Sequence, residues 1–283
     1  MYRQSGWNWL LFLRLLAFTV SLPLLTSARS RWIVYYSDQA GVEELLDYSL
    51  LVFDSDHHPP LPPMAARRKV SLGYISLGEV NDRRPYFKSA LAAGFLAGEN
   101  PTWRGSYYVD IRDQQWRQLV IGKLVPGILE QGFQGLFLDT LDDPSELERR
   151  SPAAYRGMSA AAVALVKALR QAFPSIKIMM NRGYDILPEV TGVIDMELGE
   201  SVYATYDFSR KAYHLAPAKD YQQQVRALKQ AKKLNPALGI YSLDYWDPTD
   251  RIGIRRIYRE ERANGFEPYV STIELNQVIK EPR

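Results

Sequence analysis

The chain has 283 residues, of which 46% are hydrophobic and 24% are charged, so it can bury a large core and has the size of a one-domain α/β barrel. Its formal net charge is only +3, and no strongly basic segment indicates a nucleic-acid partner. It contains no cysteine, which excludes disulfides, thiolate metal sites, a cysteine nucleophile and a lipidated cysteine.

The N-terminus has the pattern of a secretory signal peptide over residues 1–28, because Arg3 precedes a mostly apolar stretch that ends in small residues. We therefore expect an exported protein, periplasmic or extracellular, whose single domain covers residues 29–283. An uncleaved membrane anchor is the alternative, although Arg14 interrupts the apolar stretch and Pro23 breaks it. Once the signal is removed, no stable membrane span is expected.

Short apolar runs recur through the rest of the chain, and the segments between them are long enough to cross over between parallel strands. Eight runs are predicted to be strands: residues 32–36, 50–53, 70–76, 135–138, 176–180, 193–196, 237–243 and 268–271. Four crossovers show the spacing of amphipathic helices: residues 114–131, 159–173, 220–234 and 248–264. Together they predict an α/β fold, a (β/α)8 TIM barrel.

Local signals add detail to this barrel. Ser159 and Asp220 are expected helix N-caps, and Gly265 is expected to end the last helix in the left-handed conformation. Residues 107–109 are a ninth candidate strand, which we place in a long excursion after the third strand. Residues 57–63 contain four prolines and are predicted to be a loop.

Three carboxylates lie directly after the fourth predicted strand in the sequence. Asp139, Asp142 and Asp143 occupy three of the five positions after residues 135–138. The active site of a (β/α)8 barrel lies on the loops that follow its strands, so acids at this place predict catalysis. The alternative for any one of them is a turn or helix-cap role, for which aspartate is also common.

Aromatic rings, carboxylates and amides follow the other strands. The expected substrate contacts are Tyr36, Asp38, Tyr74, Glu79, Asp142, Asn181, Arg182, Glu197, Asp244 and Tyr245. Aromatic faces stack on sugar rings, and carboxylates and amides bind sugar hydroxyls, so this set favours a saccharide cleft. The chain has only three histidines, so it lacks the residues that a histidine-based hydrolase requires. It also has no glycine-rich loop of the kind that binds phosphate.

Cleavage of a glycosidic bond needs two carboxyl groups, one on each side of that bond. Asp139 and Glu200, after the fourth and sixth strands, are the expected catalytic pair, with Asp142 and Glu197 as near alternatives. No cofactor and no metal are expected. Two other functions remain open: a polysaccharide-binding barrel without catalysis, and a metal-dependent hydrolase using oxygens of Glu79, Asp139 and Asp142.

Four motifs carry a family resemblance: GYISLGE at residues 73–79, GLFLDTLD at 135–142, NRG at 181–183 and ES at 200–201. They resemble the endo-α-1,4-polygalactosaminidases of glycoside hydrolase family 114 and the related family 166 hydrolase domains of the Pel exopolysaccharide system. The resemblance covers most of the chain. It implies a (β/α)8 barrel that cleaves internal α-1,4 bonds of galactosamine or N-acetylgalactosamine polymers without a cofactor.

In that family an Asp after the fourth strand and a Glu after the sixth are catalytic, which implies these roles for Asp139 and Glu200. We expect a retaining mechanism, in which Asp139 attacks the anomeric carbon while Glu200 protonates the leaving oxygen and then activates water. Retention needs the two carboxyl groups about 5 Å apart, whereas inverting enzymes need roughly 6.5 Å or more.

Overall fold

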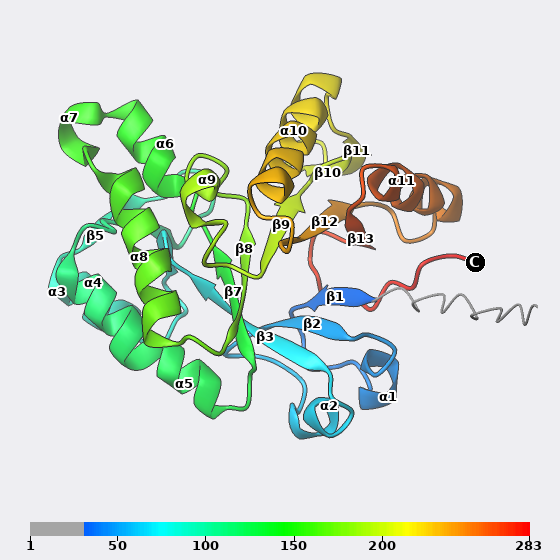
Figure 1. Cartoon of the computed structure of the whole chain (residues 1–283), viewed down its shortest axis with the longest axis horizontal. Coiled ribbons are helices and arrows are strands. Elements are labelled where there is room, and N and C mark those ends of the chain that lie inside the picture. The colour runs from blue at the N-terminus through cyan, green and yellow to red at the C-terminus, as the bar shows by residue number, and fades with distance from the viewer. Residues whose placement is uncertain (1–30) are drawn as a thin grey trace, which may run out of the picture.

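The computed structural model describes residues 31–283, and the expected signal peptide, residues 1–28, lies outside this range. Eight parallel strands form one sheet that curves into a nearly closed barrel (Figure 1). In order around the sheet they are β1 (Trp32–Tyr35), β2 (Leu50–Asp54), β3 (Val70–Ser76), β7 (Gly135–Asp139), β8 (Lys177–Asn181), β9 (Met196–Glu200), β12 (Gly239–Tyr245) and β13 (Glu267–Ser271). At the seam, Trp32 Nε1 of β1 donates a hydrogen bond to the Glu267 carbonyl oxygen of β13 at 2.9 Å. The predicted (β/α)8 architecture is confirmed.

The predicted sixth strand, residues 193–196, is wrong in position, because β9 begins only at Met196. Ile194 is apolar and buried, yet it lies in the turn before the strand. Asp195 fixes this turn, since its Oδ2 accepts hydrogen bonds from Arg170 Nη2 at 2.6 Å and from the Ile178 N–H at 3.0 Å. The strand β9 therefore begins after this turn and runs from Met196 to its last residue, Glu200.

Helices cover the outside of the barrel. They are α1 (Val42–Leu45), α2 (Pro62–Ala66), α3 (Phe87–Ala93), α4 (Gln114–Leu119), η1 (Val120–Leu124), α5 (Val125–Glu130), α6 (Asp143–Arg150), α7 (Pro152–Tyr155), α8 (Met158–Ala172), α9 (Leu187–Val190), α10 (Ala218–Leu234) and α11 (Arg251–Ala263). The helix predicted over 114–131 is one run of α4, η1 and α5, in which the π-helical turn η1 precedes Pro126. A proline lacks the N–H that a regular α-turn needs, which accounts for the irregularity there.

The two predicted N-caps are wrong. Gly157 and Pro217 occupy the N-cap positions of α8 and α10. Ser159 lies inside α8, and its N–H and hydroxyl both donate to Glu148 Oε2, at 3.0 and 2.8 Å. Gly265, with φ of 84°, follows the C-cap of α11 in the predicted left-handed conformation.

Two excursions extend the barrel at the carboxyl ends of its strands. After β3 the chain forms a small antiparallel sheet of β4 (Glu79–Asn81), β5 (Leu96–Glu99) and β6 (Ser106–Val109), ordered β4-β6-β5. After β9 it forms a hairpin of β10 (Ala204–Asp207) and β11 (Ala212–Leu215). The expected ninth strand is therefore confirmed within the excursion after β3. The proline-rich segment is a loop that ends where α2 begins at Pro62, a position that tolerates proline.

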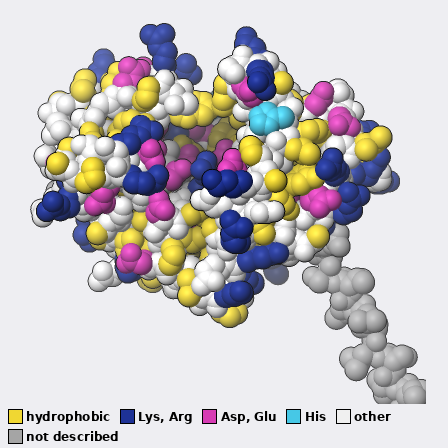
Figure 2. All heavy atoms as spheres, turned by 90° about the horizontal axis from the view of Figure 1, so that it is seen from above, with side chains coloured by type: hydrophobic (Ala, Val, Ile, Leu, Met, Phe, Trp, Pro, Cys, Tyr) yellow, Lys and Arg dark blue, Asp and Glu magenta, His cyan; other side chains and the backbone are white. Residues whose placement is uncertain are grey.

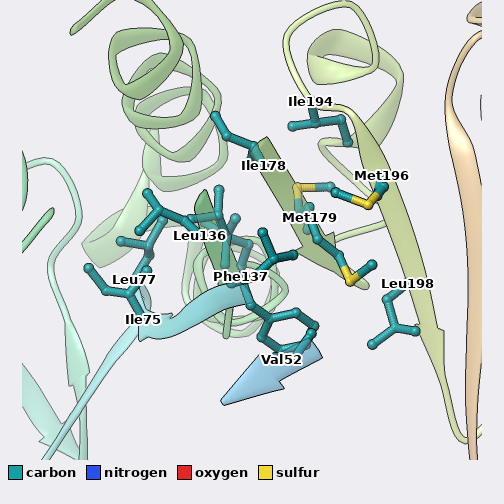
Figure 3. Close-up of a cluster of buried hydrophobic side chains, with 14 of the residues drawn as sticks. Val52, Ile75, Leu77, Leu136, Phe137, Ile178, Met179, Ile194, Met196 and Leu198 are labelled. Carbon is teal, nitrogen blue, oxygen red and sulfur yellow. The ribbon is translucent and has the colours of Figure 1, made fainter. Parts of the chain in front are cut away.

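The core fills the barrel and the space between its sheet and the helices. Phe137, Met179 and Leu198 of three neighbouring strands are each at most 2% exposed, and Figure 3 shows them with their neighbours. Burying side chains of this size is the main stabilising contribution to such a fold. Within residues 31–283, no helix is long and apolar enough to cross a membrane.

Gly135 lets β7 and β8 approach closely, which provides a test of the barrel. A Cβ at this position would lie 2.0 Å from the Lys177 carbonyl oxygen, so Gly135→Ala should lower the free energy of unfolding by about 1–3 kcal/mol. Gly127→Ala in α5 is the matched control, because its Cβ would meet nothing within 4 Å and alanine favours a helix by up to about 1 kcal/mol. Urea unfolding of both variants checks this, and equal stability of the two would contradict the barrel packing.

Candidate active site

A cleft of about 890 Å³ opens at the carboxyl ends of the strands, between the two excursions. Figure 2 looks onto this face, where the molecule is hollowed, with acidic side chains in the hollow and basic ones at its edge. Of the residues predicted from the sequence, nine line the cleft: Tyr36, Tyr74, Glu79, Asp139, Asp142, Asn181, Arg182, Glu200 and Tyr245.

The centre of the cleft is formed by the last residues of three adjacent strands. Asp139 ends β7, Asn181 ends β8 and Glu200 ends β9. The residue after each of them is left-handed, namely Thr140 with φ of 61°, Arg182 with 56° and Ser201 with 55°. This conformation costs a non-glycine residue about 1–2 kcal/mol, and such local strain gathers at functional sites. The chain thus turns sharply at three neighbouring strand ends.

The turn after Asp139 is held by the strand beside it. Thr140 Oγ1 accepts a hydrogen bond from the Gly78 N–H at 2.8 Å and lies 2.8 Å from Ser76 Oγ. A Cβ at residue 78 would lie 2.1 Å from the Thr140 carbonyl oxygen, so only glycine allows this approach. Two residues of the motif at 73–79, Ser76 and Gly78, therefore position the loop that follows Asp139.

One amide joins the two predicted catalytic carboxylates. Asn181 Nδ2 donates hydrogen bonds to Asp139 Oδ1 at 2.9 Å and to Glu200 Oε2 at 2.6 Å. The opposite amide orientation would place an oxygen against two carboxylates, so the nitrogen must face them. Because both bonds meet at one nitrogen, these carboxylate oxygens are no further apart than the sum of the two lengths, about 5.5 Å.

Two tyrosines complete the support of this pair. Tyr74 donates its hydroxyl hydrogen to Asp139 Oδ2 at 2.8 Å, and Tyr245 donates to Glu200 Oε1 at 2.5 Å. Each carboxylate oxygen therefore has one neutral donor, and neither carboxylate has an ion-pair partner among residues 31–283. Burial raises the pKa of Asp139 to about 6, with the charge of Glu200 as the second cause and the bonds from Asn181 and Tyr74 opposing it.

A second acidic group lies beside the pair. Glu79 is 5% exposed and accepts hydrogen bonds from Asn100 Nδ2 and from Ser106 Oγ. Asp143 faces it from the start of α6, and burial, followed by the charge of Glu79, raises the pKa of Asp143 to about 9. Asp142 is more open and lies 3.6 Å from an Arg182 nitrogen. The contacts of Asn100 and Ser106 were not predicted, because both residues lie in the excursion after β3, far along the chain from any motif.

Three expected substrate contacts do not line the cleft, which corrects the prediction for them. Glu197 is 0% exposed with no partner for either carboxylate oxygen within the described range, and burial raises its pKa well above the ordinary value. Asp38 lies on the surface, 3.4 Å from a ring nitrogen of His57. Successive side chains of a strand point to opposite faces of the sheet, and Glu197 lies three positions before Glu200. The side chain of Glu197 therefore points away from the face that carries Glu200.

Asp244 is the third of these residues, and it has a structural contact instead. It is 0% exposed, and its Oδ1 accepts hydrogen bonds from the N–H groups of Tyr203 and Ala204, at 2.7 and 2.8 Å. Burial raises the pKa of Asp244 to about 7, although these N–H groups oppose the shift. Asp244 thus anchors the backbone that follows Glu200 and does not face the cleft.

The acids of the cleft are not arranged as a metal site. Over residues 31–283 no group of three or more His, Cys, Asp or Glu side chains is placed to hold a metal ion. The oxygens of Glu79 already accept hydrogen bonds from an amide and a hydroxyl.

The raised pKa of Asp139 predicts a pH-dependent effect on stability. The pKa of Asp139 is about 6 in the folded state and about 3.9 in the unfolded state, so ionisation of Asp139 lowers the free energy of unfolding. This loss is complete above about pH 6 and absent below roughly pH 4. Asp139→Asn removes this cost, at most about 3 kcal/mol, and its amide can still bond Asn181 and Tyr74. The difference in Tm between variant and wild type should be several degrees larger at pH 7 than at pH 4, in favour of the variant. A Tm difference that does not change with pH would contradict the raised pKa of Asp139.

Comparison with known proteins identifies relatives of this chain. The glycoside hydrolase domain of PelA from Pseudomonas aeruginosa has a TM-score of 0.77 and 27% identity, over 88% of this chain and 97% of that one. Ega3 of Aspergillus fumigatus, solved in complex with galactosamine, shares the fold, with a TM-score of 0.64 and 14% identity over 89% of this chain and 94% of that one. An uncharacterized protein of Thermotoga maritima is 26% identical over 253 residues, which are 83% of this chain and 76% of that protein. The model of glycoside-hydrolase family GH114 matches residues 21–283, so the chain belongs to this family and is a glycoside hydrolase.

Proposed function

We propose that the protein hydrolyses internal α-1,4 bonds of galactosamine or N-acetylgalactosamine polymers, with retention of configuration at the anomeric carbon. The observation that carries this proposal is the shared amide of Asn181, which limits the closest oxygens of Asp139 and Glu200 to about 5.5 Å. Retaining glycosidases need a separation of about 5–5.5 Å, and inverting ones need space for a water molecule between carboxylate and sugar.

In the first step an Asp139 oxygen attacks the anomeric carbon, the bond to the leaving oxygen breaks, and Glu200 gives that oxygen a proton. In the second step Glu200 takes a proton from water, and the resulting hydroxide displaces Asp139 and restores its carboxylate. Burial, followed by the charge of Glu200, raises the pKa of Asp139 to about 6, so Asp139 is largely ionised, as attack requires, at neutral pH and above. Asp139 is oriented for attack by its bonds from Tyr74 and Asn181.

The substrate class is supported by the acidity of the cleft. Glu79 and Asp142 lie within the same cleft as the pair, and they suit an unacetylated amino sugar, whose ammonium group is positive. The structural neighbour Ega3 was solved with galactosamine, which is such a sugar. Export is supported by the signal-like pattern of residues 1–28 and would give the enzyme access to a polymer outside the cytoplasm.

Activity on a defined polymer tests this proposal. Mature protein should release oligosaccharides from partially deacetylated α-1,4-linked N-acetylgalactosamine polymer, detected by mass spectrometry. Asp139→Asn and Glu200→Gln should each lower kcat by roughly 10²-fold to 10⁴-fold or more, because each removes one of the two essential groups. The matched control is Asp185→Asn, which changes an exposed carboxylate paired with Arg149 and lying outside the cleft.

Added azide separates the two roles. An acid/base variant such as Glu200→Gln should regain turnover on an aryl glycoside with a good leaving group and give an azide product of retained configuration, whereas Asp139→Asn should give the inverted one. The reverse pattern would exchange the roles. Binding of polymer without release of products would indicate a binding barrel, and loss of wild-type activity in chelator would indicate a metal-dependent hydrolase.

A further inference from the structure

Two aromatic side chains meet above the cleft, one from each excursion. Trp103 lies between β5 and β6, Phe208 lies between β10 and β11, and their ring centroids are 5.0 Å apart with the planes at 85°. The two residues are 51% and 52% exposed, and both line the cleft that contains Asp139 and Glu200. Neither was singled out by the sequence analysis.

Aromatic contacts support the Phe208 ring, and a backbone hydrogen bond supports the loop that carries Trp103. Phe208 packs edge-on against Tyr206 at 5.2 Å, and Tyr206 packs against Tyr213 at 4.9 Å. On the other side, the Trp103 carbonyl oxygen accepts a hydrogen bond from the Ser106 N–H at 3.0 Å. The hydroxyl of Ser106 in turn donates to Glu79 at 2.5 Å, so the loop of Trp103 is tied to the acidic group beside the catalytic pair.

Half-exposed rings on supported loops are suited to a ligand with a flat apolar face. In an edge-to-face pair the face of one ring is not covered by the other, and the C–H face of a pyranose can stack there. The two rings are far smaller than the roughly 800 Å² that each partner contributes to a stable protein interface. A sugar unit of the polymer in the same cleft therefore fits this surface better than a protein.

We propose that Trp103 and Phe208 form a stacking subsite for a sugar unit of the polymer other than the units on either side of the cleaved bond. This inference rests on the proposed function for the identity of the polymer. The subsite contributes binding energy for a long chain, and neither ring contacts Asp139 or Glu200 by any hydrogen bond or ring contact found among residues 31–283. Its loss should therefore affect a polymer more than a small substrate.

Polymer binding in a background that does not cleave gives the most direct test. Trp103→Ala and Phe208→Ala, each combined with Glu200→Gln, should weaken binding of partially deacetylated α-1,4-linked N-acetylgalactosamine polymer by roughly tenfold per ring in calorimetry. Trp103→Phe should recover part of the affinity, because it restores an aromatic face. Leu91→Ala is the control, since Leu91 is a 56% exposed side chain on α3 that does not line the cleft.

Kinetics in the wild-type background provide the second readout. For Trp103→Ala and Phe208→Ala, kcat/KM on the polymer should fall by roughly tenfold more than kcat/KM on an aryl α-galactosaminide. Equal losses on both substrates would show that the rings only support the catalytic centre, and unchanged polymer affinity would overturn the subsite. Loss of self-association without loss of polymer binding would instead make the rings a protein contact.

The failure of the subsite and the failure of the proposed function give different results. If the wild type cleaves the polymer and the ring variants bind it normally, only the subsite is wrong. If the wild type neither binds nor cleaves this polymer, the substrate assignment is wrong and with it the ligand of the subsite. If binding depends on the rings but nothing is cleaved, the subsite stands and the catalytic proposal fails.

Discussion

The pair of hydrogen bonds from Asn181 to Asp139 and Glu200 is the interaction on which the active site depends. Two carboxylates at this separation repel each other, and among residues 31–283 neither of them forms an ion pair. A neutral amide can hold them close without neutralising either, and the hydroxyls of Tyr74 and Tyr245 do the same from the outside.

The barrel makes this arrangement possible, because β7, β8 and β9 are neighbours and each supplies its last residue. The left-handed residue after each strand lets the chain leave the sheet at once, and Gly78 allows the neighbouring turn to pack on Thr140. Such strained turns and uncompensated carboxylates reduce stability, which the large buried core must offset. Acids away from the cleft add to this cost. Burial, with the charge of Asp244 as the next cause, raises the pKa of Glu261 to about 9.

The sequence was sufficient for the parts of this protein that depend on local patterns. Apolar runs and crossovers predicted the barrel, and the position of Asp139 directly after such a run predicted its place at the barrel mouth. Glu200 was predicted as the second catalytic residue, but Glu197 stayed an alternative, because the apolar residue Ile194 led to a sixth strand predicted three residues too early. Contacts such as that of Trp103 with Phe208 join two excursions distant in sequence, and no periodicity marks either residue.

The anomeric configuration of the first product shows whether the shared amide holds the carboxylates close enough for direct attack on the sugar. Proton NMR during the first minutes of hydrolysis of an α-1,4-linked galactosamine oligomer distinguishes the two anomers before they interconvert. Retention predicts the α-anomer as the first new reducing end, since two displacements at the same carbon restore its configuration. The β-anomer as first product would show a single displacement by water and would contradict a nucleophilic role for Asp139.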